Sequence, residues 1–484
     1  AGRAAGSAER TAREPLDVTR LLQRVLPALM FAALLVVFVR LSAVPLDNTD
    51  TYFHLRFGEE FLHHWSLRHP GSVSTFATAH WVPTQWLPEI VMAKFGDWFG
   101  LAGVAWLSGV QQLGLVAALY VVARRWADPL VVVLVLIPTL AACSIGLSMR
   151  PQVLSYILAA VFVGAWLKTR DDGRPRWWLV PLTWLWAMLH GMWPIGIGLG
   201  VVGVAGLALD RRLGRRELVR VALVPIGSAV VGALTPVGPA LYGAVLGVGS
   251  RSRFFSEWKS PDYTAVPACM ALALLLAVVA VLFLRSPRRT WTETLFFLTA
   301  GACALWSYRT VPVAAVVLMP LMARAIQGRV PGAPLPVRRA ELWSVAGGCA
   351  TALAVLAIAV PRTSDEPFAQ PSWVDPALSS LPAGTKVVSD WDYGGYLMWR
   401  FPQLDLLAHG YGDTFTIAEL QRNTDIIEVA PNWDTELKAT GVTVAVLKPK
   451  TPLAYALEHD TQPWTVVHRS TSMEMLTAPP GWTS

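Results

Sequence analysis

Charged residues are scarce in this chain of 484 residues: Asp, Glu, Lys and Arg make up 15% of it, whereas 54% of the residues are hydrophobic. Soluble domains carry about 25% charged residues. Apolar stretches recur between residues 21 and 361, and their lengths approach the ~20 residues that a helix needs to cross a bilayer. The composition therefore excludes an ordinary soluble protein and predicts a polytopic α-helical membrane protein.

Cysteine is also scarce. The four cysteines, Cys143, Cys269, Cys303 and Cys349, all fall inside apolar stretches, and none stands in a CxxC or other metal-binding spacing. Thiols in such positions are not expected to form disulfides or to bind zinc. We interpret all four as small packing residues.

The chain lacks the patterns of a nucleic-acid-binding surface and of a signal peptide. Its net charge is +7, but the basic residues stand in clusters between apolar stretches, which is typical of cytoplasmic loops. No nucleic acid is therefore expected as a partner. Residues 1–20 are rich in Ala, Arg and Glu without the apolar core of a signal peptide. We expect a cytoplasmic N-terminal tail followed by an uncleaved anchor helix.

The apolar stretches predict about eleven membrane-spanning helices within residues 21–361. Their approximate ranges are 21–44, 100–123, 128–147, 152–168, 177–190, 194–209, 218–236, 264–284, 291–307, 311–326 and 341–361. Alternate gaps carry the basic clusters: Arg13 with Arg20 and Arg24, Arg124–Arg125, 168–176, 211–216, 285–289 and 324–339. The positive-inside rule places these clusters in the cytoplasm. With an odd number of helices, the N-terminus is inside and residues 362–484 are outside a bacterial cytoplasmic (inner) membrane.

The gaps on the outer side hold nearly every unusual polar residue of the membrane part. Ordinary extracytoplasmic loops would explain them, and an active site confined to one face is the alternative that we pursue. The longest gap, 45–99, is amphipathic, and its helical spacing around 59–65 and 86–95 predicts helices lying in the membrane interface. The polar residues are Asp47, Asp50, His54, Arg56, Arg150, Gln152, His190, Glu257 and Arg309.

Residues 362–484 differ from the rest of the chain. Short apolar runs at 386–389 and 442–447 alternate with helical and turn patterns. Runs of this length with β-branched residues are typical of strands. The sequence therefore predicts a small extracytoplasmic α/β domain.

Two carboxylates, Asp47 and Asp50, follow the first apolar stretch directly. Paired carboxylates can bind a hard divalent cation such as Mg²⁺ or Mn²⁺, or can take a proton from an acceptor hydroxyl. A metal here would neutralise a phosphate leaving group. The plainer alternative is that Asp47 caps a helix beginning near Thr49.

A helix beginning there would carry further polar side chains. Residues four apart share a helix face, so Asp50 and His54 are expected to point the same way. Arg56 would either hold a phosphate with two hydrogen bonds or pair with an acid of its own loop. These alternatives stay open in the sequence.

Further polar residues lie at or near the expected outer ends of later helices. Arg150 and Gln152 begin one, and an arginine there either snorkels to the interface or adds to an anion site at the helix N-terminus. His190 stands between two tryptophan-rich stretches, as a packing residue or as a pocket residue. Glu257 and Arg309 complete the outer polar set, and neither is informative alone.

In the tail, Trp391, Asp392 and Tyr393 precede two glycines and follow a strand-like run. Glycines permit a tight backbone and close approach by a ligand. Aromatic residues around a carboxylate are typical of surfaces that recognise sugars or peptides, and we expect these three residues to bind an acceptor. A turn over an aromatic core is the alternative.

Two of these strings resemble motifs of the GT-C superfamily of membrane glycosyltransferases. Residues 50–56 (DTYFHLR) are similar to the first-loop motif of oligosaccharyltransferase catalytic subunits, in which an Asp precedes an aromatic pair and then an Arg. Residues 391–394 (WDYG) match most of the WWDYG motif, which contacts the acceptor peptide in that family; Asp390 replaces its first Trp. A second-loop acidic pair of that family is not found, and residues 148–151 (SMRP) stand near its position.

The resemblance implies an inverting glycosyltransferase with a GT-C-like transmembrane domain at 21–361, which takes a sugar from a polyprenyl-phosphate donor at the membrane. Asp50 would be the base or metal ligand, assisted by Asp47. Arg56, Arg150 and Arg309 would bind the donor phosphate, with His54, Gln152, His190 and Glu257 in the pocket. The acceptor would be an extracytoplasmic glycan, lipid or protein. Two alternatives lack chemistry: a transporter or flippase of lipid-linked glycan, and a scaffold for cell-envelope assembly.

Overall fold

The computed structural model describes residues 18–283, 290–362 and 370–482. Most of the expected N-terminal tail, including Arg13, and the basic segment 285–289 lie outside the described residues. The helices are α1 Val18–Ser42, α2 Thr49–His63, α3 Trp86–Ala123, α4 Pro129–Cys143, α5 Gln152–Asp172, α6 Leu179–Leu189, α7 Pro194–Asp210, α8 Arg215–Val231, α9 Ala240–Arg251, α10 Val266–Val278, α11 Trp291–Trp306, α12 Val311–Gln327, α13 Arg339–Ala359, α14 Val374–Ser379, α15 Trp391–Arg400, α16 Ile417–Ile427, α17 Trp433–Thr440 and α18 Pro452–His459.

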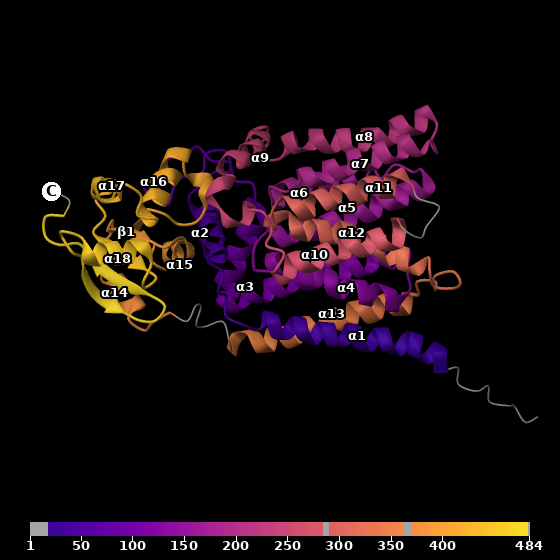
Figure 1. The fold of residues 1–484 in the computed structure, drawn as a ribbon, viewed down its shortest axis with the longest axis horizontal. Coiled ribbons are helices and arrows are strands. Elements are labelled where there is room, and N and C mark those ends of the chain that lie inside the picture. The colour runs from indigo at the N-terminus through magenta and orange to yellow at the C-terminus, as the bar shows by residue number, and fades with distance from the viewer. Residues whose placement is uncertain (1–17, 284–289, 363–369, 483–484) are drawn as a thin grey trace, which may run out of the picture.

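Each of the eleven stretches expected to span the membrane overlaps one of these helices, and α3 joins the stretch 100–123 to the segment 86–95 with a non-helical Gly100 between them. Seven helical segments of the described chain are long and apolar enough to cross a membrane, and α6, α7 and α10 are shorter apolar helices. The chain is thus a membrane protein by composition and length, and the number eleven stays a prediction. The helices lie side by side, and α1 begins at the end of the bundle opposite the C-terminal domain, as the expected topology requires (Figure 1).

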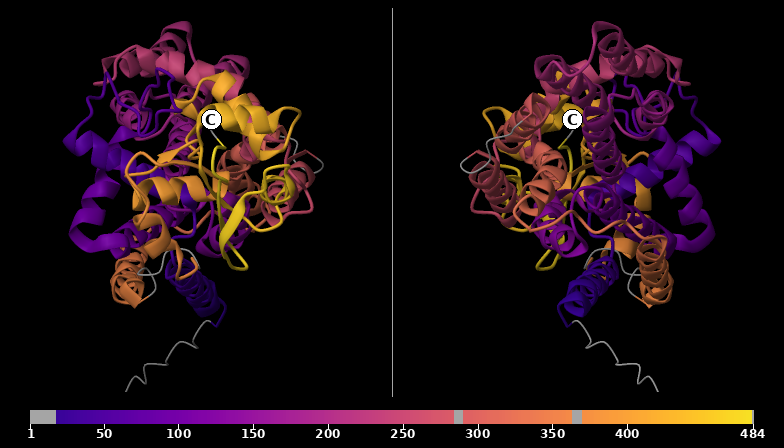
Figure 2. Two further views of the ribbon diagram at one scale, coloured as in Figure 1. Left: turned by 90° about the vertical axis from the view of Figure 1, so that its left-hand side faces the viewer. Right: turned by 90° about the vertical axis from the view of Figure 1, so that its right-hand side faces the viewer.

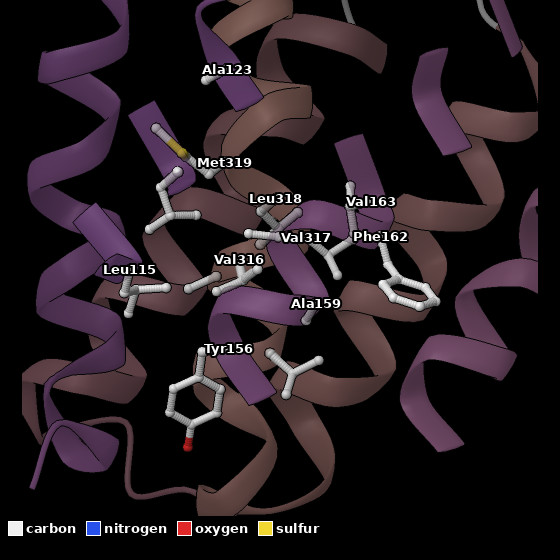
Figure 3. Packing of buried hydrophobic residues seen from close by; sticks show 14 of the residues in the cluster. Leu115, Ala123, Tyr156, Ala159, Phe162, Val163, Val316, Val317, Leu318 and Met319 are labelled. Carbon is white, nitrogen blue, oxygen red and sulfur yellow. The ribbon is translucent and has the colours of Figure 1, made fainter. Parts of the chain in front are cut away.

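The centre of the bundle is α12. The most apolar part of the segment Tyr308–Gln327, which includes α12, is 89% buried, whereas the most apolar part of α13 is only 17% buried. A helix that is apolar on all sides is stable only when other helices or lipid surround it. Neighbouring helices pack around the run from Val316 to Met319, with Tyr156 and Phe162 of α5 nearby (Figure 3). Helix α13 instead packs beside α1 at one side of the bundle (Figures 1 and 2).

Residues 370–482 form the expected α/β part, with five strands in the order β2-β1-β3-β5-β4. The strands are β1 Lys386–Ser389, β2 Asp405–Leu406, β3 Val444–Leu447, β4 Thr465–Arg469 and β5 Glu474–Thr477. β1 pairs in parallel with β2 and β3, whereas β5 is antiparallel to β3 and β4. The apolar runs at 386–389 and 442–447 were expected to be strands, and β1 and β3 confirm this.

Helix α15 follows β1 directly and begins at Trp391, so residues 391–396 form helix rather than the turn that we had considered. Its two glycines permit close contacts on two sides. A Cβ at Gly394 would lie 2.6 Å from the Cα of His409, and one at Gly395 would lie 2.3 Å from the carbonyl oxygen of Thr49. The backbone of α15 therefore rests directly on the first turn of α2.

The long loop at residues 45–99 forms further hydrogen bonds with the C-terminal domain. Ser74 Oγ donates to Asp405 Oδ1 at 2.9 Å, and Thr78 Oγ1 donates to Glu419 Oε1 at 2.6 Å. The backbone N–H of Ala79 donates to the carbonyl of Thr414 at 3.0 Å. Helix α2 packs against α3 and α15, and half of its residues are buried. The segments 59–65 and 86–95, expected to lie in the membrane interface, fall at the end of α2 and the start of α3, and their interfacial location stays a prediction.

Replacing Gly395 by Ala should separate α15 from α2, since the new methyl group meets rigid backbone atoms. We expect a loss of about 1–3 kcal/mol in stability, as for other overpacked sites, measured as a lower melting temperature in detergent. Gly347→Ala in α13 is the matched control, because nothing lies within 4 Å of its Cβ position. Equal melting temperatures for the two variants would contradict the close contact.

Candidate active site

The first turn of α2 positions Asp50. The side chain of Asn48 accepts a hydrogen bond from the backbone N–H of Asp50 at 2.9 Å, so Asn48 is the N-cap and the helix begins at Thr49. Asp47 is therefore not the cap. It is exposed and lines a separate cavity to which Asp50 does not contribute.

Arg150 joins Asp50 to a second carboxylate. Its Nη1 donates to Asp50 Oδ2 at 2.6 Å and to Glu257 Oε1 at 2.5 Å. Glu257 lies in a short 3₁₀ turn, η4 (Ser256–Trp258), and its Oε2 accepts from Arg309 Nη1 at 2.9 Å. The guanidinium of Arg309 also lies 5.3 Å from the centre of the Trp258 ring. Four charged residues from four separate segments thus form one alternating chain.

Hydrogen bonds fix the segment that carries Arg150. Thr51 Oγ1 donates to the carbonyl of Met149 at 2.9 Å, which holds this segment against α2. Arg150 Nε donates to Ser148 Oγ at 3.0 Å, and Gln152, with its amide oxygen turned toward Arg150, accepts from Nη2 at 2.7 Å. The arginine is therefore held in place at the start of α5.

The two carboxylates of this chain differ in electrostatic environment. Burial raises the pKa of Asp50, and the nearby charge of Arg150 offsets this only in part. Burial also acts to raise the pKa of Glu257, but Arg150 and Arg309 outweigh it, so that pKa is lowered. Opposite shifts of two neighbouring acids are typical of sites in which one acid exchanges a proton and the other stays charged. Asp50 is the one suited to accept a proton.

Two histidines of the predicted pocket, His54 and His190, are buried. His54, on the same face of α2 as Asp50, lies with Nδ1 2.9 Å from Glu89 Oε1, and both side chains are buried. Burial lowers the pKa of His54 well below its usual value. His190 Nδ1 lies 2.9 Å from Ser155 Oγ. These contacts give both histidines structural partners, and their role as pocket residues stays a prediction.

Arg56 does not join the charged chain. Its Nη2 lies 2.7 Å from Glu60 Oε1, one turn along the same helix. The alternative that it pairs with an acid of its own loop is the one that the structure shows. Arg56 therefore stands apart from Arg150 and Arg309 in the described structure, and its part in binding the donor phosphate stays a prediction.

The metal expectation fits these side chains poorly. Within the described residues no group of three or more His, Cys, Asp or Glu could hold a metal ion. Asp47 is turned to another cavity, and the Asp50 carboxylate is already paired with Arg150. A Mg²⁺ or Mn²⁺ ion at Asp50 would have to displace the guanidinium, and the requirement for a metal stays a prediction.

The three expected acceptor-binding residues point in different directions. The ring of Trp391 lies 6.4 Å from that of Phe255, close to the η4 turn. Asp392 is exposed and pairs with Lys448, whereas Tyr393 is buried and its hydroxyl donates to the carbonyl of Ser472. Of the three, Trp391 alone has a ring contact with the segment that carries Glu257.

The loop His409–Asp413 is a second contribution of the C-terminal domain, and it was not predicted from the sequence. Tyr411 packs against the rings of Phe53 and Trp81, at 4.9 and 5.6 Å. A Cβ at Gly412 would lie 2.1 Å from the Phe255 ring. Burial raises the pKa of Asp413, and the charges of Arg251 and Arg309 offset this only in part. Two glycines around a tyrosine, followed by an acid, were the signal available in the sequence.

No family model matches the sequence, and no curated protein matches it. Solved structures do match. The apo oligosaccharyltransferase of Archaeoglobus fulgidus aligns at 13% identity with a TM-score of 0.53, over 87% of this chain and 69% of that one. ArnT from Cupriavidus metallidurans, bound to undecaprenyl phosphate, aligns at 15% identity with a TM-score of 0.51, over 94% and 98% of the two chains.

This chain has the GT-C fold. The same archaeal enzyme in complex with an inhibitory peptide and a dolichol-phosphate aligns at a TM-score of 0.54, with 13% identity over 89% of this chain and 70% of that one. At these identities the likeness concerns the fold alone. The architecture implied by residues 50–56 and 391–394 is thereby confirmed.

Replacing Arg150 by Gln should raise the pKa of Asp50 further, because the charge that offsets its burial is removed. A carboxyl with a higher pKa in the folded state binds more protons when folded, so stability falls as the pH rises between its unfolded and folded pKa values. Because an unfolded Asp has a pKa of about 3.9, we expect the melting temperature of R150Q to fall more steeply with rising pH than that of the wild type from about pH 4 upward.

Thermal unfolding in detergent across this pH range checks the prediction. The double variant D50N/R150Q should lose the part of the added slope that comes from residue 50, whereas the part from Glu257, whose pKa Arg150 also lowers, should remain. Arg253→Gln, at an exposed position outside the charged chain, is the control. A slope in R150Q equal to that of the wild type would show that Arg150 does not act on Asp50.

Proposed function

We propose that this protein is an inverting membrane glycosyltransferase that moves a sugar from a polyprenyl-phosphate donor to an acceptor on the outer face of a bacterial cytoplasmic membrane. The bridge from Arg150 to Asp50 and Glu257 is the observation that carries the proposal. Two structural neighbours support it, since one is bound to undecaprenyl phosphate and the other to dolichol-phosphate. The topology that puts the N-terminus inside belongs to the same proposal.

In this proposal the donor phosphate binds to Arg150 and Arg309. Arg309 contacts Glu257 through Nη1, and its side chain is 28% exposed. Of the five N–H donors of Arg150, those of Nε and Nη1 and one of Nη2 bind Ser148, Asp50, Glu257 and Gln152, which leaves one donor on Nη2. Arginine is suited to phosphate because its planar fork matches two oxygens. Glu257, held between the two arginines, fixes their spacing before the donor arrives.

Asp50 then acts as the general base. The acceptor hydroxyl oxygen attacks the anomeric carbon of the sugar while its proton passes to Asp50. The bond from that carbon to the phosphate oxygen breaks, and its electron pair leaves with the phosphate, whose charge the two arginines stabilise. Attack opposite the leaving group inverts the anomeric configuration. Trp391, Asp392 and Tyr393 remain the proposed contacts to the acceptor.

Asp50→Asn should reduce transfer by about 10²–10⁴-fold, the usual contribution of a general base. The assay uses purified protein in lipid, a panel of radiolabelled polyprenyl-phosphate sugars and a crude cell-envelope acceptor. Asp97→Asn, an exposed acid of the same outer loop that pairs with Lys94, is the control and should keep full activity.

Repeating the assay with EDTA tests whether the cation beside Asp50 is Arg150 or a metal ion. With Arg150 as the cation beside Asp50, we expect transfer to continue in EDTA. Loss of transfer that Mn²⁺ restores would instead favour a metal-bound Asp50. If no donor is consumed by wild type or variant while a control transferase works, the transport and scaffold alternatives gain the advantage.

Arg309→Gln should raise the KM for the donor about tenfold or more, because a hydrogen bond to a charged group contributes about 1.5–3 kcal/mol. Steady-state kinetics with the active donor measure this, and Arg309→Lys should recover part of the loss. Arg253→Gln is the matched control at an exposed arginine. An unchanged KM in R309Q would remove Arg309 from the phosphate site.

A further inference from the structure

A second cavity lies beside the catalytic carboxylate, on the side of α1 and α4. Its volume is about 470 Å³, within the range of roughly 300–1,000 Å³ for ligand pockets. Residues of α1, the segment 44–48, α3, α4 and the segment 147–149 line it. This cavity belongs neither to the charged chain of Arg150 nor to the C-terminal domain.

The cavity opens toward the bilayer. Three apolar residues of its wall, Val37, Leu41 and Ile137, are 50%, 65% and 44% exposed on helices long and apolar enough to span a membrane. Exposed apolar side chains on such helices face lipid chains. The occupant available from that side is therefore a hydrocarbon chain.

The opposite end of the cavity is polar and lies next to the catalytic pair. Asn48, which lines it, accepts the hydrogen bond from the Asp50 N–H, and Ser148, which also lines it, accepts from Arg150 Nε. Thr51 completes this end. Asn48 and Ser148 are thus shared between this end of the cavity and the Asp50–Arg150 pair, so a head group seated there lies next to Asp50.

The charge of the cavity distinguishes the two substrates. Among the described residues that line it there is no Lys, Arg or His, and Asp47 places a carboxylate at the polar end. A phosphate is repelled by a carboxylate and finds no cation there. The donor phosphate is therefore directed to Arg150 and Arg309, and this cavity suits a lipid whose head group is uncharged and rich in hydroxyls.

We infer that the acceptor is a membrane lipid with an uncharged, hydroxyl-bearing head group, seated in the cavity between α1 and α4. This inference rests on the proposed function and narrows its acceptor class. The lipid hydroxyl oxygen forms the new bond to the anomeric carbon, its proton passes to Asp50, and the donor phosphate leaves with the electron pair of the broken bond. The product is a lipid that carries one more sugar.

A photocrosslinking experiment tests whether a lipid binds in the cavity between α1 and α4, and it needs no donor. The probe is a monohexosyl diacylglycerol with a diazirine in one acyl chain, added to the full-length protein in nanodiscs. We expect labelled peptides from residues 34–44 and 137–144, with competition by unlabelled glycolipid and at least about tenfold weaker competition by phosphatidylglycerol, a difference of about 1.4 kcal/mol.

Variants that fill the cavity sharpen the test. Leu41→Trp changes an exposed position and should not disturb folding, and Ala141→Phe narrows the cavity from the opposite wall. Both should reduce labelling about tenfold. Leu298→Trp and Ala205→Phe, at exposed positions of α11 and α7, are the matched controls and should label as the wild type does.

Transfer assays then separate this inference from the proposed function. We expect a radiolabelled product that chloroform extracts, and a KM for the lipid acceptor about tenfold higher in Leu41→Trp with kcat unchanged. Equal labelling of all four variants, equal competition by phosphatidylglycerol, or a product found only on protein or soluble glycan would overturn the lipid acceptor while leaving the transferase intact. Specific labelling without transfer from any donor would refute the transferase instead, and with it the acceptor role of the lipid seat.

Discussion

The Arg150 guanidinium lies between two carboxylates that stand 100 and 107 residues from it along the chain. Without this charge, Asp50 and Glu257 would be two partly buried acids facing each other, and one would have to take up a proton. The arginine fixes where α2, the start of α5 and the η4 turn meet. It acts to lower the pKa of both acids; burial still raises the pKa of Asp50, whereas Arg309 joins Arg150 in lowering that of Glu257, and the proposed division of roles depends on this difference.

The C-terminal domain holds two segments of the charged site in place, in addition to carrying the expected acceptor-binding residues. Gly395 brings the backbone of α15 onto Thr49, next to Asp50, and Gly412 receives the ring of Phe255, two residues before Glu257. The segments that carry Asp50 and Glu257 are thus both held by close contacts from the C-terminal domain. Motif residues that resemble an acceptor contact therefore also keep α2 in place, and this role needs glycine in particular.

In the proposed function, the bilayer would let a donor and an acceptor reach Asp50 by separate routes. Lipid enters between helices only where apolar side chains face it, and head groups stay at the polar ends. The arginines attract phosphate to one side of Asp50, while Asp47 repels it from the cavity on the other side. Charge, rather than shape alone, would therefore sort a phosphate-linked donor from an uncharged acceptor.

Local sequence was enough to predict the membrane class, the apolar helices and the strands β1 and β3, and it picked out Asp50 and Arg150 as candidate site residues. Period, length and charge asymmetry are local properties, so they can be read from short stretches. Only the tertiary structure decided which of several similar arginines faces Asp50. Arg56 lies six residues from Asp50 in sequence yet pairs with Glu60, because residues four apart share a helix face. Arg150, Glu257 and the loop His409–Asp413 converge through packing between distant segments, and nothing in their local sequence encodes that meeting.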